Sequence, residues 1–208
     1  MQDIFLNPEH TAFMIIDVQN DFCHEDGAQA KLGNDVTGAQ KAVPVMEDLM
    51  AEARLRGIPI IYVYTTHSDT SSSKAWVNRP NGRSRLSVVR EGTWGAEYYR
   101  VSPQEGDIVV EKHRYSAFIR TALEEKLRQL GIKSLILTGV ATNVCVESTA
   151  RHGFMLDFNI TMVRDGCAAY ATELEEATYR NIQTNFGLVL DSKDIKEYWS
   201  NLQQAVKR

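Results

Sequence analysis

Strand-length apolar runs alternate with amphipathic segments along this chain, and this alternation constrains its fold more than any other feature. The apolar runs lie at residues 12–17, 59–64, 108–111, 134–140, 160–163 and 187–190. Helical spacing of apolar side chains occurs at residues 43–55, 118–130, 144–154, 173–185 and 192–206. Near-continuous apolar strands joined by helices are typical of a parallel sheet covered on both faces. We therefore predict one α/β domain over residues 1–208, a three-layer Rossmann-like fold with roughly six parallel strands and helices on both faces.

Residues 66–100 interrupt the alternation. This stretch contains three consecutive serines, several glycines, and the tryptophans Trp76 and Trp94 among several arginines. Long connections without regular structure are usually either functional or disordered. The tryptophans and arginines favour an ordered insert, which covers a pocket or contacts a partner subunit, over a disordered loop.

Composition and charge exclude several classes of protein. The 208 residues carry a formal net charge of −4, with 43% hydrophobic and 24% charged residues, as in ordinary globular domains. Nucleic-acid binding requires a basic face, so no nucleic-acid partner is predicted. No apolar run approaches the ~18 residues that a membrane span needs, and the first residues lack signal-peptide features. We expect a cytoplasmic protein without a membrane partner, in which the sparse cysteines Cys23, Cys145 and Cys167 are free thiols.

Three reactive side chains lie directly after predicted strands, where ligands bind in open parallel sheets. Asp17 ends the first run, Lys112 follows the third, and Cys145 comes shortly after the fourth. Taken singly, Asp17 could cap a turn, Lys112 could be a surface lysine, and Cys145 could be a small buried apolar residue. Together they suggest catalysis, because a helix start and a nearby cation lower the pKa of a thiol and populate its thiolate near neutral pH. An adjacent carboxylate could then act as base and acid.

The same residues lie in segments that resemble the isochorismatase-like cysteine hydrolase superfamily. The matching segments are residues 13–22, 110–118, 137–151 and 162–167, in the family's order. The versions at 112–118 and 139–149 are most similar to the ureidoacrylate and carbamoyl amidohydrolase branch. This resemblance implies a catalytic triad of Asp17, Lys112 and Cys145 and a cis peptide between Val140 and Ala141. It also implies an oxyanion hole formed by the N–H groups of Ala141 and Cys145.

The activity implied by the resemblance is a cysteine-dependent amidohydrolase. Such an enzyme cleaves the C–N bond of a small amide, ureido or carbamoyl compound through a thioester acyl-enzyme, and releases ammonia or an amine. The resemblance also implies a homo-oligomer, either a dimer or a tetramer. The alternatives are an isochorismatase-type vinyl ether hydrolase, a nicotinamidase-like amidase, and a catalytically silent binding protein on the same fold.

Departures from the family pattern limit which metal and which substrate we expect the site to bind. Nicotinamidases of the superfamily hold a metal with an Asp-x-His pair and a further His, whereas His67 has no partner histidine nearby in the sequence. We therefore predict no metal and no cofactor. An arginine in the pocket would suit a carboxylate-bearing substrate, although single arginines in such a stretch are often solvated surface residues. The residues predicted to contact substrate are Asn20, Phe22 and Tyr115 from the triad loops, and Trp76, Arg79 and Trp94 from the insert.

Overall fold

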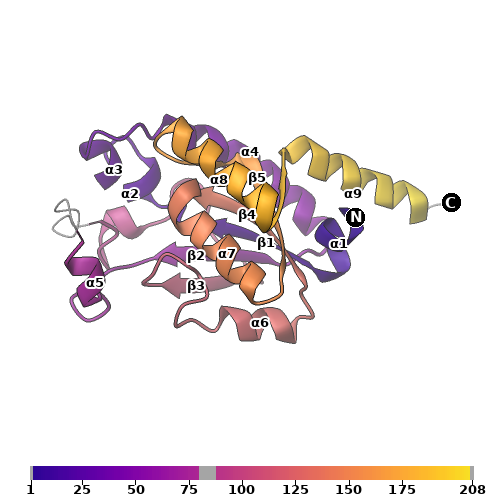
Figure 1. Cartoon of the computed structure of the whole chain (residues 1–208), viewed down its shortest axis with the longest axis horizontal. Coiled ribbons are helices and arrows are strands. Elements are labelled where there is room, and N and C mark those ends of the chain that lie inside the picture. Colours follow the sequence, from indigo (N-terminus) through magenta and orange to yellow (C-terminus); the bar gives the residue numbers. More distant parts are fainter. Residues whose placement is uncertain (1, 80–87, 207–208) are drawn as a thin grey trace.

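The computed structural model describes residues 2–79 and 88–206, which form a six-stranded, all-parallel sheet (Figure 1). The strand order is β3-β2-β1-β4-β5-β6. The order reverses between β1 and β4, which are neighbours in the sheet although they are far apart in the sequence. The strands are β1 (Thr11–Ile16), β2 (Ile60–Thr65), β3 (Ile108–Lys112), β4 (Ser134–Val140), β5 (Asn159–Ala168) and β6 (Gly187–Leu190). The predicted fold class is confirmed.

Two apolar clusters cover the two faces of the sheet. Alternate side chains of β1 separate between them: Phe13 and Ile15 belong to one cluster, and Met14 and Ile16 to the other. The first cluster is closed by α4 (Thr37–Arg54) and α9 (Ser192–Val206), with Leu6 at the end of α1 (Gln2–Leu6). The second is closed by α6 (Leu123–Gln129), α7 (Glu147–Met155) and α8 (Thr172–Asn185). Both faces of the sheet are covered, which explains why β1 and β4 at its centre are buried along their whole length.

Some element bounds differ from the prediction. The helix expected at residues 118–130 starts only at Leu123, because Arg120 has φ 58° and the Thr121 hydroxyl donates to the Ala117 carbonyl at 2.5 Å. These features form a local turn that competes with the helix. The helix expected at 43–55 begins earlier, at Thr37, and β5 continues to Ala168 after a register shift against β4. Short helices that we did not expect are α2 (Asn20–Cys23), α3 (Ala28–Lys31) and α5 (Lys74–Val77), with 3-10 turns η1 (Pro8–His10) and η3 (Trp94–Ala96).

Two isolated bridges hold the segment 66–100. One lies within the segment and joins His67 to Arg90, and the other joins Tyr98 to Gln19 in the loop after β1. Inside the segment, α5 and η3 are the described helical turns, and residues 80–87 lie outside the described residues. None of the described helices is both long enough and apolar enough to cross a membrane.

Candidate active site

The ends of β1 and β4 meet at the point where the strand order reverses. Asp17 directly follows β1, and Cys145 lies in the π-helical turn η4 (Thr142–Val146) after β4. The two strands can approach closely here because Gly139 has no side chain: a Cβ at this position would lie 2.0 Å from the carbonyl oxygen of Ile16. Gly139 also has φ +124°, a conformation that other residues rarely adopt. Glycine at this position therefore allows the thiol and the carboxylate to lie together.

Asp17 and Lys112 form a fully buried ion pair. The Lys112 Nζ lies 2.7 Å from Asp17 Oδ2, and neither side chain is exposed. Lys112 ends β3, so its side chain crosses the end of β2 to reach Asp17. Burial disfavours the charge on Lys112, but the negative charge of Asp17, with smaller contributions from the hydrogen bond to Asp17 and from Cys145, outweighs burial and raises the pKa of the lysine. The ammonium is therefore held in its charged form beside the carboxylate.

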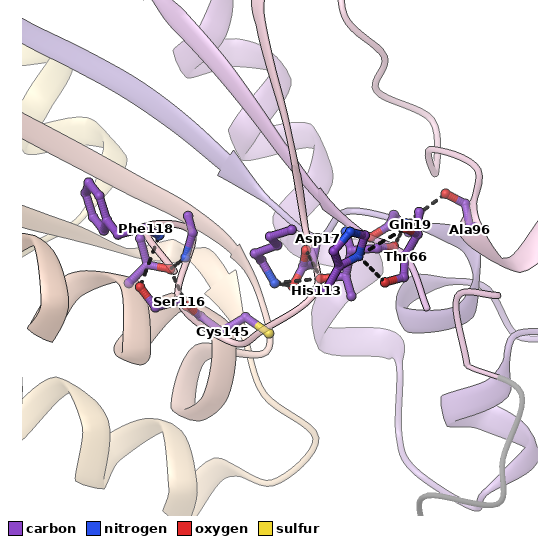
Figure 2. A network of polar contacts seen from close by, with 12 residues as sticks. Asp17, Gln19, Thr66, Ala96, His113, Ser116, Phe118 and Cys145 are labelled. Atoms are coloured by element: carbon purple, nitrogen blue, oxygen red, sulfur yellow. Dashed lines mark hydrogen bonds and ion pairs between the residues drawn. The ribbon is translucent and has the colours of Figure 1, made fainter. Parts of the chain in front are cut away.

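Thr65 and Gln19, which we did not predict as site residues, complete the surroundings of this pair. The Thr65 hydroxyl lies 2.6 Å from Lys112 Nζ and 2.9 Å from Asp17 Oδ1. The Gln19 amide binds the N–H and the carbonyl of Thr65, both at 2.9 Å, and donates to the carbonyl of Ala96 at 2.7 Å (Figure 2). Both residues follow the same strand-end pattern that selected Asp17 and Lys112, so this pattern could have identified them.

Cys145 points from η4 toward Asp17 (Figure 2). Its side chain is buried, with the residue 8% exposed, and it lines a cavity beside the ion pair. Burial raises the pKa of the thiol, and the negative charge of Asp17 raises it further, while Lys112 opposes this shift. We expected Cys145 to be a thiolate near neutral pH. That prediction is wrong, because burial and the Asp17 carboxylate raise the pKa of the thiol more than the Lys112 ammonium lowers it. The resting side chain is a thiol whose proton needs an acceptor.

The expected cis peptide between Val140 and Ala141 is present. Ala141, which directly precedes η4, and Cys145, which lies within η4, both line the cavity. The thiol and the candidate oxyanion-hole residues thus come from one short segment.

The cavity has a volume of about 490 Å³. Four of the six residues predicted to contact substrate line it: Phe22, Trp76, Arg79 and Tyr115. The other two do not. Asn20 is buried and donates from its side chain to the carbonyl of Trp94 at 2.8 Å, so it ties α2 to η3. The Trp94 ring packs edge-on against His24 and is 45% exposed.

One wall of the cavity is a stack of aromatic rings and a guanidinium. The His67 ring lies 4.2 Å from the Trp76 ring, and the Arg79 guanidinium lies 4.4 Å from the centre of the same indole. Arg79 also donates to the Tyr115 hydroxyl and to the carbonyl of Trp76. These contacts fix the guanidinium against the cavity. The described lining residues include two arginines, Arg79 and Arg114, and neither Asp nor Glu.

His67 and His113 both line the cavity, although they are distant in the sequence. Burial lowers the pKa of His67 to about 4, with smaller contributions from the positive charges of Lys112 and His113. His67 is therefore neutral near pH 7. His113 places Nδ1 2.9 Å from the Thr66 carbonyl. Among residues 2–79 and 88–206, no group of three or more His, Cys, Asp or Glu side chains is arranged to hold a metal ion.

A parallel sheet with its cavity at the strand-order reversal, beside a buried ion pair and a thiol, defines the class of protein as a hydrolytic enzyme with a Rossmann-like α/β fold. The chain belongs to the isochorismatase family, since the family's Isochorismatase domain matches residues 11–194. The resemblance drawn from the sequence segments is confirmed.

Several known proteins are similar to this chain over most of its length. Ureidoacrylate amidohydrolase RutB of Acinetobacter baylyi is 33% identical over 219 residues, covering 98% of this chain and 89% of the relative. A cysteine hydrolase from Pseudomonas syringae pv. phaseolicola shares the fold with a TM-score of 0.84 at 24% identity, covering 94% of each chain. Nicotinamidase PncA from Bacillus subtilis has a TM-score of 0.74 at 27% identity, covering 87% of this chain and 99% of the other.

Proposed function

We propose that this protein is a cysteine-dependent amidohydrolase that cleaves the C–N bond of a small amide, ureido or carbamoyl compound. The observation that carries this proposal is the buried Asp17–Lys112 pair beside a thiol that lines the same cavity. A protonated thiol needs a base at hand, and Asp17 is the carboxylate toward which Cys145 points (Figure 2). The similarity to an enzyme named ureidoacrylate amidohydrolase supports the same bond type.

In the first half of the reaction, the acyl group moves to sulfur. Asp17 takes the proton of the Cys145 thiol as the sulfur attacks the carbonyl carbon, and the carbonyl π pair moves onto oxygen. The N–H groups of Ala141 and Cys145 hold this oxyanion, an interaction that is worth roughly 3 kcal/mol per donor in other hydrolases. When the C–N bond breaks, Asp17 gives its proton to the departing nitrogen. Ammonia or an amine leaves, and a thioester remains.

In the second half, water releases the acyl group. Asp17, again a carboxylate, takes a proton from the water as its oxygen attacks the thioester carbon. The tetrahedral intermediate collapses, the C–S bond breaks, and the proton returns from Asp17 to sulfur. The products are a carboxylic or carbamic acid and the original thiol. Lys112 keeps its charge throughout and stabilises the carboxylate form of Asp17.

The charge of the cavity supports a substrate that carries a carboxylate. Arg79 is held by Tyr115 and Trp76, and it lines a cavity that has no acidic residue among the described lining residues. Arginine binds carboxylates through two parallel hydrogen bonds, so a ureido or carbamoyl acid fits this wall better than an uncharged amide. Asn20 and Trp94 are not proposed as substrate contacts, because neither lines the cavity.

Two alternatives differ from this proposal, the first in its substrate and the second in its reaction. The fold shared with a nicotinamidase favours a nicotinamidase-like amidase as the second candidate. An isochorismatase-type enzyme would cleave a vinyl ether without needing the thiol. A cytoplasmic location and a homo-oligomer remain predictions.

A substrate panel tests the proposal. Ureido acids, carbamoyl amino acids, their uncharged analogues and nicotinamide are assayed for ammonia, and isochorismate is assayed for pyruvate. We expect ammonia release to be fastest from the carboxylate-bearing ureido or carbamoyl compounds. Cys145→Ala should lower this rate by about 10³-fold or more, with an unchanged circular dichroism spectrum.

Three other results would contradict the proposal or favour one of the two alternatives. Ammonia release that survives in Cys145→Ala would overturn thiol catalysis. Pyruvate release that persists in the same variant would support the ether hydrolase, and a preference for nicotinamide would support the second candidate.

A further inference from the structure

Thr65 occupies the space between the two charged members of the candidate triad. It ends β2, is 5% exposed, and lines the cavity. It is paired in register with Lys112 of β3, so the two side chains start from neighbouring strand ends. Its hydroxyl reaches Lys112 Nζ at 2.6 Å and Asp17 Oδ1 at 2.9 Å. Nothing in the acyl-transfer chemistry above uses this hydroxyl.

The chemistry of the partners determines the direction of both bonds. An ammonium group can only donate, so the Thr65 oxygen accepts from Lys112. The single hydroxyl proton is then directed to Asp17, which accepts it on Oδ1 while Oδ2 accepts from Lys112. Both carboxylate oxygens are thereby held by donors from β2 and β3. The plane of the carboxylate cannot turn without the loss of one of these bonds.

The backbone of Thr65 is fixed as firmly as its side chain. Gln19 accepts from its N–H and donates to its carbonyl, each at 2.9 Å. Gln19 follows β1 only two positions after Asp17, so the same loop that presents the carboxylate also clamps the residue that holds it. The hydroxyl therefore has a fixed position relative to Asp17.

We propose that Thr65 is a positioning residue of this active site, whose hydroxyl aims the Asp17 carboxylate at the thiol and holds it there while Cys145 delivers its proton. A hydrogen bond from a neutral donor stabilises the charged carboxylate more than its protonated form. Loss of the Thr65 hydroxyl would therefore remove one donor that stabilises the carboxylate form. Once Asp17 is protonated, the same bond promotes proton release to the departing nitrogen. This inference rests on the proposed amidohydrolase function.

Among the described residues, four other titratable groups lie near enough to Asp17 to interact with its charge. They are Lys112 of β3, Cys145 of η4, Cys23 of α2, and Tyr170, which follows β5. The pKa of each of these four groups is raised, so none of them changes its charge on the acid side of neutrality. His67, which lines the same cavity, has a pKa of about 4, but it is present in every variant compared. A difference between the acid limbs of these variants therefore reports the Thr65 hydroxyl rather than His67 or the four neighbours.

The pH dependence of Cys145 alkylation tests this role without any choice of substrate. The full-length protein is treated with iodoacetamide across a pH series, and the modified Cys145 peptide is quantified by mass spectrometry, separately from Cys23 and Cys167. Thr65→Val removes the hydroxyl and keeps the shape, whereas Thr65→Ser keeps the hydroxyl. Thr138→Val is the matched control, since the buried Thr138 hydroxyl donates to the Met14 carbonyl at 2.8 Å and not to the triad.

The acid limb is the pH range in which the alkylation rate of Cys145 falls as the solution becomes more acidic. We expect this limb to lie about one to two pH units higher in Thr65→Val, the effect of one lost hydrogen bond to a charge. Thr65→Ser and Thr138→Val should keep the limb of the unmodified protein. With an active substrate, Thr65→Val should lower kcat about tenfold or more and leave KM nearly unchanged. If Thr65→Val does not fold, Thr65→Ala carries the same expectation.

An acid limb that is unmoved in the hydroxyl-free variant, or moved equally in Thr65→Ser, would overturn the role of Thr65 and leave the proposed function intact. Hydrolysis by Cys145→Ala would instead overturn the proposed function. The two failures are therefore distinguishable.

Discussion

The Cys145 side chain is subject to opposing electrostatic influences. Burial and the Asp17 carboxylate raise the pKa of the thiol, and Lys112 lowers it. The first two effects win, so the nucleophile rests in its neutral form, unlike thiols that are exposed at a helix start. A neutral thiol becomes a strong nucleophile only when a base takes its proton. Its reactivity then depends on the orientation of a single carboxylate.

His67 gives a pH prediction at the same scale. Its pKa falls from the ordinary 6.5 to about 4 in the folded protein, chiefly through burial. Between these values the unfolded chain binds a proton that the folded chain does not, so acidification destabilises the fold. In His67→Phe, which keeps a ring against Trp76, this contribution is absent. Urea unfolding at about pH 7 and about pH 4.5 should show that the wild-type loses more stability than the variant.

Equal losses of stability in the two proteins would contradict the burial of a neutral imidazole at this position. The comparison is made between two proteins at each pH, so the titration of the carboxylates, which both proteins share, cancels.

At the scale of elements, the contact between β1 and β4 positions the site. Gly139 allows this contact, since a Cβ there would meet the Ile16 carbonyl oxygen at 2.0 Å. Asp17 directly follows β1 and Cys145 lies in the turn η4 after β4, so a displacement of β4 would separate Cys145 from Asp17. The precision of the candidate triad thus depends on one glycine in the middle of the sheet.

Gly139→Ala should therefore cost about 2–5 kcal/mol in unfolding free energy, from the clash and the positive φ together. Gly57→Ala is the control: Gly57 also has positive φ, +69°, but a Cβ there meets nothing within 4 Å. The control should lose only about 1–2 kcal/mol. Chemical denaturation measures both. Equal losses would show that β4 does not need the close approach.

The elements also show what the sequence could predict. Apolar runs predicted all six strands. The signal is clearest for β1 and β4, which are buried at every position and show no alternation of buried and exposed residues. The start of α6 was missed, since a threonine side chain and a positive φ at Arg120 favoured a turn that apolar spacing does not reveal. Asp17, Lys112 and Cys145 were predicted from their positions at strand ends.

Other parts of the site were not predictable in this way. The spacing of residues cannot show that the Asn20 side chain serves a backbone carbonyl, or that His113 approaches His67, because both depend on how loops fold over the sheet. The state of the Cys145 thiol depended on the degree of burial, which strand-end position does not report.

At the scale of the whole molecule, the candidate active site lies at the carboxyl-terminal end of a sheet that is covered by helices on both faces. The two apolar clusters support the sheet from both faces, and the cavity is lined by residues at and after the carboxyl ends of the strands, such as Thr65, His113 and Cys145. Side chains from β1, β2, β3 and the turn after β4 meet there. Arg79 and Arg114 line this cavity, and we expect a substrate carboxylate to bind there.

The central claim is that the acyl group of the substrate passes through Cys145. The most direct measurement quenches the enzyme with acid during its first turnover of an active ureido or carbamoyl acid, and determines the mass of the Cys145 peptide. We predict an added acyl group on this peptide, and neither the adduct nor ammonia release in Cys145→Ala. Ammonia release by Cys145→Ala at the wild-type rate, with Cys145 of the wild-type never modified, would contradict the account.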